Sequence, residues 1–199
     1  MQDARTPAIC NAVLKIPVLT PTSWWVSFAA GLLRCTKTAM KTLNIHSRGR
    51  WPASALSNFA PHTFVFRGIH FECVEALLQG LKFQDPNEQK IVFALDARKA
   101  KKTGSRSDWQ ASQTLWWLGQ PMGRLSQDYQ TLLNDAFRTL YAQNEEARKA
   151  LLATGDAVLI HRIGKTNPAE TVLTQDEFIS RLTKLRAALQ PQEVWRHAR

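Results

Sequence analysis

The sequence predicts a mainly helical α+β domain with a few short strands. The clearest helical signal covers residues 127–143, where apolar side chains recur at the spacing that places them on one face of a helix. Residues 62–71 form an alternating stretch around Arg67-Gly68, a pattern typical of a short β-hairpin. The chain has 199 residues, 44% of them hydrophobic and 21% charged, which is enough for one domain with a sizeable core.

Three helices are expected to follow the hairpin. The first begins near Val74 and ends before Asp85-Pro86, because the residue before a proline disfavours helical backbone. Residues 87–101 are expected to form the second helix, and residues 99–106 a basic connector. Residues 109–118 are expected to form the third, which is broken at Gly119-Gln120-Pro121.

The second half of the chain is expected to be helical around one strand. Ser126 is a suitable N-cap for the helix over residues 127–143, and another helix is expected over residues 145–153. The apolar run at residues 157–161 predicts a short strand. Thr174 is expected to cap a last helix that reaches about Leu189.

The first 39 residues differ in character from the rest. Their apolar run, Trp24 to Leu33, is too short to span a bilayer, which needs about 20 apolar residues. A signal peptide is the alternative, but no small-residue cleavage site follows. Met40 reads as an ordinary protein start. We therefore expect an N-terminal extension over residues 1–39, the domain over 40–190 and a C-terminal tail over 191–199.

The chain is strongly basic, with a formal net charge of +10. Residues 1–39 carry +3 of this, from four basic residues against one acidic, which leaves +7 for the remainder. Such a charge suits polyanionic partners, either a pyrophosphate-bearing nucleotide or a nucleic acid. Three cysteines, Cys10, Cys35 and Cys73, form no Cys-x-x-Cys pair, so we expect neither a zinc site nor a disulfide framework, and we expect a cytoplasmic protein.

Three polar residues interrupt the apolar helix that begins near Val74. Glu75, Gln79 and Lys82 follow one another at helical spacing, so they fall within about 60° on one face. Because apolar residues surround them, the carboxylate and the amine are expected to be partly desolvated. Such a pair is a candidate for acid and base chemistry. An ordinary helical ion pair with a neighbouring amide is the alternative.

The order of these motifs resembles a known family. Residues Ser57 to Pro61, then the hairpin with its glycine turn, then Val74-Glu75 with Gln79 and Lys82, look like the NADAR superfamily, whose members cleave N-glycosidic bonds to ribose or ADP-ribose. The resemblance covers residues 45–187. Further segments recur in the same order: Ala100 to Gly104, Asp108-Trp109, Leu115 to Gly119, Arg124 to Tyr129, Leu151 to Asp156 and His161 to Lys165.

Two departures from the family pattern bear on the substrate more than on the fold. Ala76-Leu77 follows the helix glutamate where many relatives have His-Tyr or Gly-Phe. Gly164 to Pro168 stands in place of a glycine-rich Trp-Gly segment, so the C-terminal loop is expected to reshape the pocket.

The resemblance implies a catalytic role for Glu75 and for Lys82. A carboxylate near the anomeric carbon stabilises an oxocarbenium-like transition state and can transfer a proton. A partly buried amine loses its proton more easily and can attack C1 of the sugar to form a Schiff base. Lys82 could instead only position Glu75 or a phosphate. Gln79 is expected to hydrogen-bond the substrate or Glu75.

The resemblance also implies substrate contacts, each with a structural alternative. Asn58 could contact ribose or phosphate, or close a turn on its own backbone. Trp109 could stack on a base or belong to the core. Asp156 could accept ribose hydroxyls or end a helix. His161 and Lys165 flank Gly164 in a turn suited to phosphate. The complete set of expected binding residues is Ser57, Asn58, Phe59, Gln79, Trp109, Asp156, His161, Gly164 and Lys165.

Together with the resemblance, these residues predict a metal-independent N-glycosidase. The five histidines lack metal-ligand spacing, and no phosphate-binding loop motif is present, so we expect neither a metal nor a cofactor. The resemblance implies a substrate with a ribosyl or ADP-ribosyl group, and the basic charge of the chain favours ADP-ribose on guanine, free or in a nucleic acid; no membrane partner is expected. The alternatives are an N-glycosidase for phosphorylated riboflavin-pathway intermediates and a non-catalytic module that binds ADP-ribose or nucleic acid.

Overall fold

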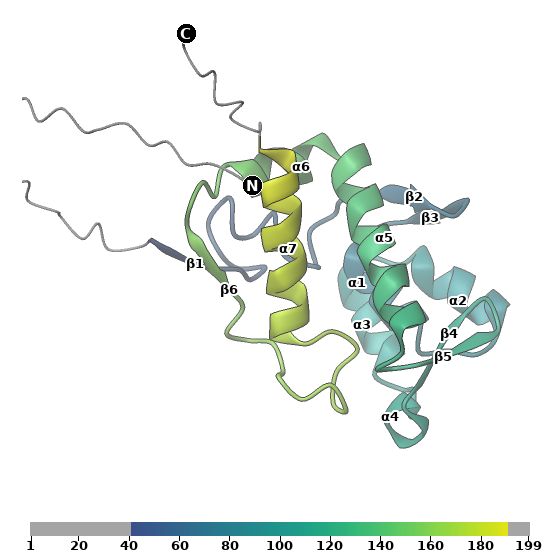
Figure 1. Ribbon diagram of the computed structural model, residues 1–199. Coiled ribbons are helices and arrows are strands. Elements are labelled where there is room, and N and C mark those ends of the chain that lie inside the picture. Colours follow the sequence, from purple (N-terminus) through teal and green to yellow (C-terminus); the bar gives the residue numbers. More distant parts are fainter. Residues whose placement is uncertain (1–40, 191–199) are drawn as a thin grey trace, which may run out of the picture. The chain divides into compact units, whose positions relative to one another are not determined.

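Seven helices and three two-stranded sheets make up residues 41–190, the part of the chain that the computed structural model describes (Figure 1). The predicted α+β fold class is therefore confirmed. The strands are β1 (Thr42–Asn44), β2 (Phe64–Phe66), β3 (Ile69–Phe71), β4 (Thr114–Trp117), β5 (Gln120–Gly123) and β6 (Val158–Ile160). The helices are α1 (Val74–Gly80), α2 (Pro86–Phe93), α3 (Ala97–Gly104), α4 (Trp109–Ser112), α5 (Gln127–Gln143), α6 (Glu145–Leu152) and α7 (Gln175–Leu189).

The predicted hairpin is confirmed as the antiparallel pair β2 and β3. Its turn residues Arg67 and Gly68 have φ values of 49° and 78°, the left-handed conformation that two-residue hairpin turns of this kind require at both positions. Phe64 and Phe71 face each other across the strands and stack at 5.1 Å, which anchors the hairpin in the core.

All residues of helix α1 are buried. The helix contacts α2 and α3, while α5 packs against β2, α6 and α7. Figure 1 shows α5 and α7, the two longest helices, side by side. A helix that is buried on every side leaves no solvated face for Glu75 and Gln79, so their polar atoms need partners inside the protein.

The expected single helix over residues 87–101 is wrong, because the chain forms two helices there. Helix α2 ends at Phe93, and α3 begins after Asp96, whose carboxylate accepts hydrogen bonds from the backbone N–H groups of Arg98 and Lys99. This cap starts a new helix, α3, which packs against α1. The basic connector expected over residues 99–106 lies largely in α3.

The expected helix over residues 109–118 is also wrong. A single turn, α4, ends at Ser112, its C-cap residue Gln113 has a φ of 50°, and the chain continues into the hairpin of β4 and β5. Buried Gln89 holds this hairpin, because it donates to the carbonyl of Trp116 at 2.6 Å and accepts from the backbone N–H of Leu118 at 2.7 Å. These tertiary hydrogen bonds favour the extended backbone that the apolar pattern alone did not indicate.

The other predicted elements are confirmed, but the first helix ends at Gly80 and not just before Asp85. Lys82, expected on the same helix face as Glu75 and Gln79, therefore lies in the turn after the helix. Ser126 caps α5, and Thr174 caps α7 in a reciprocal capping box with Glu177. Strand β6 pairs in parallel with β1, a strand that the sequence analysis did not anticipate. Residues 1–39 and 191–199, expected as an extension and a tail, lie outside the described residues, so those limits stay predictions. No helix within residues 41–190 is long and apolar enough to cross a bilayer.

Candidate active site

Helix α1 lines a cavity and supplies its two most buried polar side chains. Cys73 caps the helix through its sulfur, and Glu75 and Gln79 lie one turn apart with only 4% and 1% of their surfaces exposed. Gly80 ends the helix where the ring of Phe93 lies so close that it leaves no room for a Cβ. Lys82 therefore lies just beyond α1, in the turn that follows.

The Glu75 carboxylate receives two donors on one oxygen. Gln79 Nε2 donates to Oε1 of Glu75 at 2.7 Å, and Nζ of Lys101, from α3, lies 3.1 Å from the same oxygen. The backbone N–H of Glu75 donates to the carbonyl of Asn58 at 3.0 Å, which ties the loop before the hairpin to the first turn of α1. Glu75 is thus a buried carboxylate whose neighbouring cation, Lys101, is largely exposed.

Lys82 places a second amine at this cavity. Its Nζ donates to the carbonyl of Gly104 at 3.2 Å and lies 6.0 Å from the ring centre of Trp109. Desolvation by burial, reinforced by the positive charge of Lys101, lowers the pKa of Lys82 to about 8, although Glu75 opposes the shift. The structure thus places an amine with an easily lost proton in the same cavity as a buried carboxylate.

Three buried polar atoms of cavity residues have no hydrogen-bond partner among residues 41–190. They are Oδ1 of Asn58, Oε1 of Gln79 and Nε1 of Trp109. The donation from Gln79 Nε2 to Glu75 fixes the orientation of the Gln79 amide, which leaves its oxygen as the free acceptor. Buried polar atoms are normally satisfied, so these two acceptors and one donor match a ligand that carries N–H or O–H groups and an acceptor.

The segment between β6 and α7 supplies another part of the cavity wall. His161 follows β6, and its Nδ1–H donates to the carbonyl of Ile45 at 2.7 Å. Gln175 donates to the carbonyl of Gly164, and Lys165 forms an exposed ion pair with Glu170 at 3.2 Å. The enclosed space is about 410 Å³, the size of a small-molecule site.

Sequence comparison assigns the chain to a family. The family described as bacteriophage protein GP30.3 matches residues 50–187. The chain belongs to the GP30.3 family. It is 40% identical over 152 residues to the "Uncharacterized 17.1 kDa protein in Gp30-rIII intergenic region" of enterobacteria phage T4, an alignment that covers 75% of this chain and 100% of that protein.

A solved structure shares the fold of this GP30.3-family chain. The NMR structure of the E. coli protein YbiA has a TM-score of 0.54 and 19% sequence identity, and the match covers 75% of this chain and 85% of YbiA. At this identity the likeness concerns the fold alone. It supports the NADAR-like fold that the sequence motifs predict.

All of the predicted site residues except Asp156 line the cavity. Asp156 is instead exposed in the turn between α6 and β6. Asp156 precedes β6 and His161 follows β6. The three residues of this strand, with a rise of about 3.3 Å per residue, lie between Asp156 and His161. The structure therefore corrects the grouping of Asp156 with the other site residues, because an extended strand holds it away from them.

Several residues that line the cavity were not among the predicted site residues. Lys101 is the most consequential, since it is the cation that contacts Glu75. Its segment, Ala100 to Gly104, is one of the motifs that resemble the family, but no spacing rule relates α3 to α1, so only the packing of the two helices reveals the pair. The others are Ser47, Leu78, Ile163, Glu170, Thr171, Val172 and Leu173.

Among the described residues, this site has neither a cluster of metal ligands nor a reactive thiol. Among residues 41–190, no three His, Cys, Asp or Glu side chains lie close enough together to hold an ion. The free thiol of Cys73 is buried, and burial raises its pKa to about 11, which makes it a poor nucleophile.

Proposed function

We propose that this chain is an N-glycosidase that hydrolyses the bond between a base and ribose or ADP-ribose, with ADP-ribose on guanine as the preferred substrate. One observation carries the proposal. Buried Glu75 lies in a cavity of ligand size together with Lys82, an amine whose pKa is lowered to about 8. The NADAR-like fold supports the same reaction class, while the substrate rests on the resemblance and on the basic character of the chain.

In this proposal Glu75 stabilises positive charge on the sugar. The bond between the anomeric carbon and the base nitrogen breaks, and its electron pair leaves with the base, which takes up a proton. Water adds to the anomeric carbon and loses a proton, so one water is consumed in each turnover. Because Lys101 is largely exposed, it can move away from Glu75 as positive charge develops on the sugar, while Gln79 keeps the carboxylate oriented.

Lys82 offers a covalent form of the same reaction. Its neutral amine attacks the anomeric carbon as the base leaves, and opening of the sugar ring gives a protonated imine. Water then hydrolyses the imine, which frees the sugar and restores the amine. The depressed pKa favours this route, because a larger share of Lys82 is neutral near physiological pH than of an ordinary lysine.

The test is a metal-free assay of wild type, Glu75→Gln and Lys82→Ala on ADP-ribosylated guanosine, followed by mass spectrometry. We expect Glu75→Gln to fold and to lose turnover by about 10² or more. Borohydride should add the mass of the reduced sugar at Lys82 in wild type. Trapping at no lysine, with turnover retained in Lys82→Ala, would contradict the covalent route.

The same assay separates the two alternatives. Turnover of phosphorylated riboflavin-pathway intermediates, with inert ADP-ribosylguanosine, would redirect the proposal to those substrates. A folded wild type that binds ADP-ribose but hydrolyses neither substrate, with binding retained in Glu75→Gln, would identify a binding module instead.

A further inference from the structure

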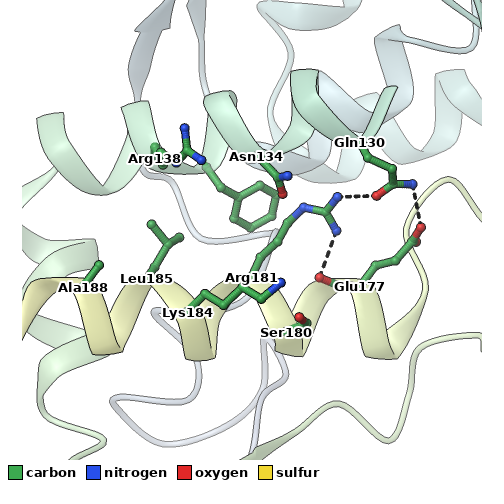
Figure 2. A pocket seen from close by; sticks show the side chains of 10 residues that line it. Gln130, Asn134, Arg138, Glu177, Ser180, Arg181, Lys184, Leu185 and Ala188 are labelled. Carbon is green, nitrogen blue, oxygen red and sulfur yellow. Dashed lines mark hydrogen bonds between the residues drawn. The ribbon is translucent and has the colours of Figure 1, made fainter. Parts of the chain in front are cut away.

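A second cavity, of about 510 Å³, lies between α5 and α7 (Figure 2). Its lining is polar and cationic around Arg181 and Lys184, and apolar at Leu185 and Ala188, the end where Arg138 lies on α5. None of the residues assigned to the reaction lines this groove. Its chemistry therefore points to a separate ligand.

Glu177, a carboxylate in the lining of the groove, is already neutralised by a buried cation. Arg124 is almost completely buried, and its guanidinium donates to both carboxylate oxygens of Glu177, at 3.0 and 2.6 Å. Gln130 and the backbone N–H of Thr174 also donate to that carboxylate, at 2.9 and 2.8 Å. The hydrogen-bonding capacity of Glu177 is thus taken up by groups other than Arg181.

Arg181 is the second buried guanidinium, with 7% of its surface exposed. Among the described residues it donates only to neutral acceptors, the backbone carbonyl of Glu177 at 2.9 Å and the side-chain oxygen of Gln130 at 2.6 Å. Its Nε has no hydrogen-bond partner in the described part of the chain, and Figure 2 shows the guanidinium in the space between the two helices. One carboxylate therefore faces two buried guanidinium groups, and an anion in the groove would balance the remaining charge.

The rim of the groove adds further donors for an anion. Lys184 is exposed almost one turn after Arg181 on α7, and Arg138 on α5 has 70% of its side chain exposed. Arg138 is partly balanced by Asp135 at 3.2 Å, whereas no salt bridge involves Lys184 among the described residues. Asn134 and Ser180 line the same space with neutral hydrogen-bonding groups.

We propose that the groove between α5 and α7 is an anion site that binds a phosphate group, carried by a free nucleotide or by the backbone of a nucleic acid strand. Phosphate oxygens accept the several charge-assisted hydrogen bonds that Arg181, Arg138 and Lys184 can donate. The site does not depend on the proposed glycosidase reaction, and its test measures binding alone.

The experiment titrates the full-length chain with ADP and, separately, with a short fluorescent oligothymidylate at several salt concentrations. Lys184→Glu reverses an exposed charge at the groove, and Lys90→Glu makes the same change on α2. We expect Lys184→Glu to weaken binding about tenfold relative to Lys90→Glu. For the oligonucleotide, log affinity decreases with log salt concentration, and the magnitude of this negative slope should be smaller by about 1 in Lys184→Glu.

Each outcome decides the proposal. Sensitivity to Lys184→Glu with ADP alone supports the site and identifies the source as a free nucleotide, while sensitivity with the oligonucleotide identifies a strand. Equal binding by Lys184→Glu and Lys90→Glu overturns the proposal, since ADP held in the α1 cavity would be insensitive to Lys184. If neither probe binds wild type, the proposal is overturned as well.

Discussion

Lys101 and Glu75 form an ion pair of 3.1 Å between α3 and α1, and the two partners differ sharply in exposure. The Glu75 side chain is 5% exposed and that of Lys101 is 59% exposed. Lys101 also contributes to the lowered pKa of Lys82, through repulsion between the two amines. One exposed lysine therefore acts on both residues to which we assign the chemistry.

Lys101→Met is expected to raise the pKa of Lys82, because it removes the positive charge that opposes protonation. If neutral Lys82 reacts, turnover at neutral pH falls, and the rise of the rate with pH moves to higher pH. The measurement is the pH profile of kcat/KM. Lys102→Met, at the next exposed position of α3, is the matched control and should leave the profile unchanged.

Lys82 should be labelled by acetic anhydride with half-maximal rate at pH about 8. The folded pKa lies below the ordinary value, so the amine is protonated and unreactive below this pH and becomes reactive as the pH rises through it. Mass spectrometry of the labelled peptide gives the profile. A reference peptide that contains lysine, labelled in the same tube, should reach its half-maximal rate at pH ~10.4. The same midpoint for Lys82 would refute its lowered pKa.

Gly104→Ala is expected to damage the site from outside the cavity. The added methyl would overlap Oε1 of Gln79 and come 2.8 Å from its Cβ, so Gln79 must move away from Glu75. Overpacking of this kind costs roughly 1–3 kcal/mol, which exceeds or offsets the gain of about 1 kcal/mol in helix propensity.

Urea unfolding and turnover measure the effect of that substitution. Gly123→Ala is the control, because its methyl would meet nothing closer than Cβ of Ser126 at 3.8 Å. Equal stability and equal turnover of the two variants would show that the contact between Gly104 and Gln79 is unimportant.

Glu177 is expected to account for part of the decrease in the free energy of unfolding at acidic pH. Desolvation by burial opposes its ionisation, but hydrogen bonds from Arg124, Thr174 and Gln130 lower its pKa to about 2. Since the folded pKa is below the ordinary value, the stabilisation is complete above pH 4.5 and is lost as the pH falls toward about 2. The contribution of ionised Glu177 to the free energy of unfolding is on the order of 3 kcal/mol.

Glu177→Gln should therefore be less stable than wild type at neutral pH, and its free energy of unfolding should depend less on pH across that acid window. Urea titrations monitored by circular dichroism measure both quantities. Glu146→Gln removes an acid whose side chain is 72% exposed on α6 and serves as the control. Equal acid dependence in Glu177→Gln and wild type would argue against the assigned role of Glu177.

Local sequence determined the elements whose signals lie within a few residues. Arg67-Gly68 specified the hairpin turn, Ser126 and Thr174 specified helix starts, and the periodicity of α1 placed Glu75 and Gln79 on one buried face. These features depend on backbone preference and on side-chain spacing, which a sequence displays directly.

Tertiary structure decided what depends on partners distant along the chain. Gln89 holds residues 114–118 as part of a hairpin, and α3 packs against α1 so that Lys101 reaches Glu75. Arg124 likewise contacts Glu177 from the turn after β5, and within residues 41–190 Arg181 is left with neutral acceptors only. No local pattern encodes these contacts, because they form only when the burial of apolar faces brings the helices together.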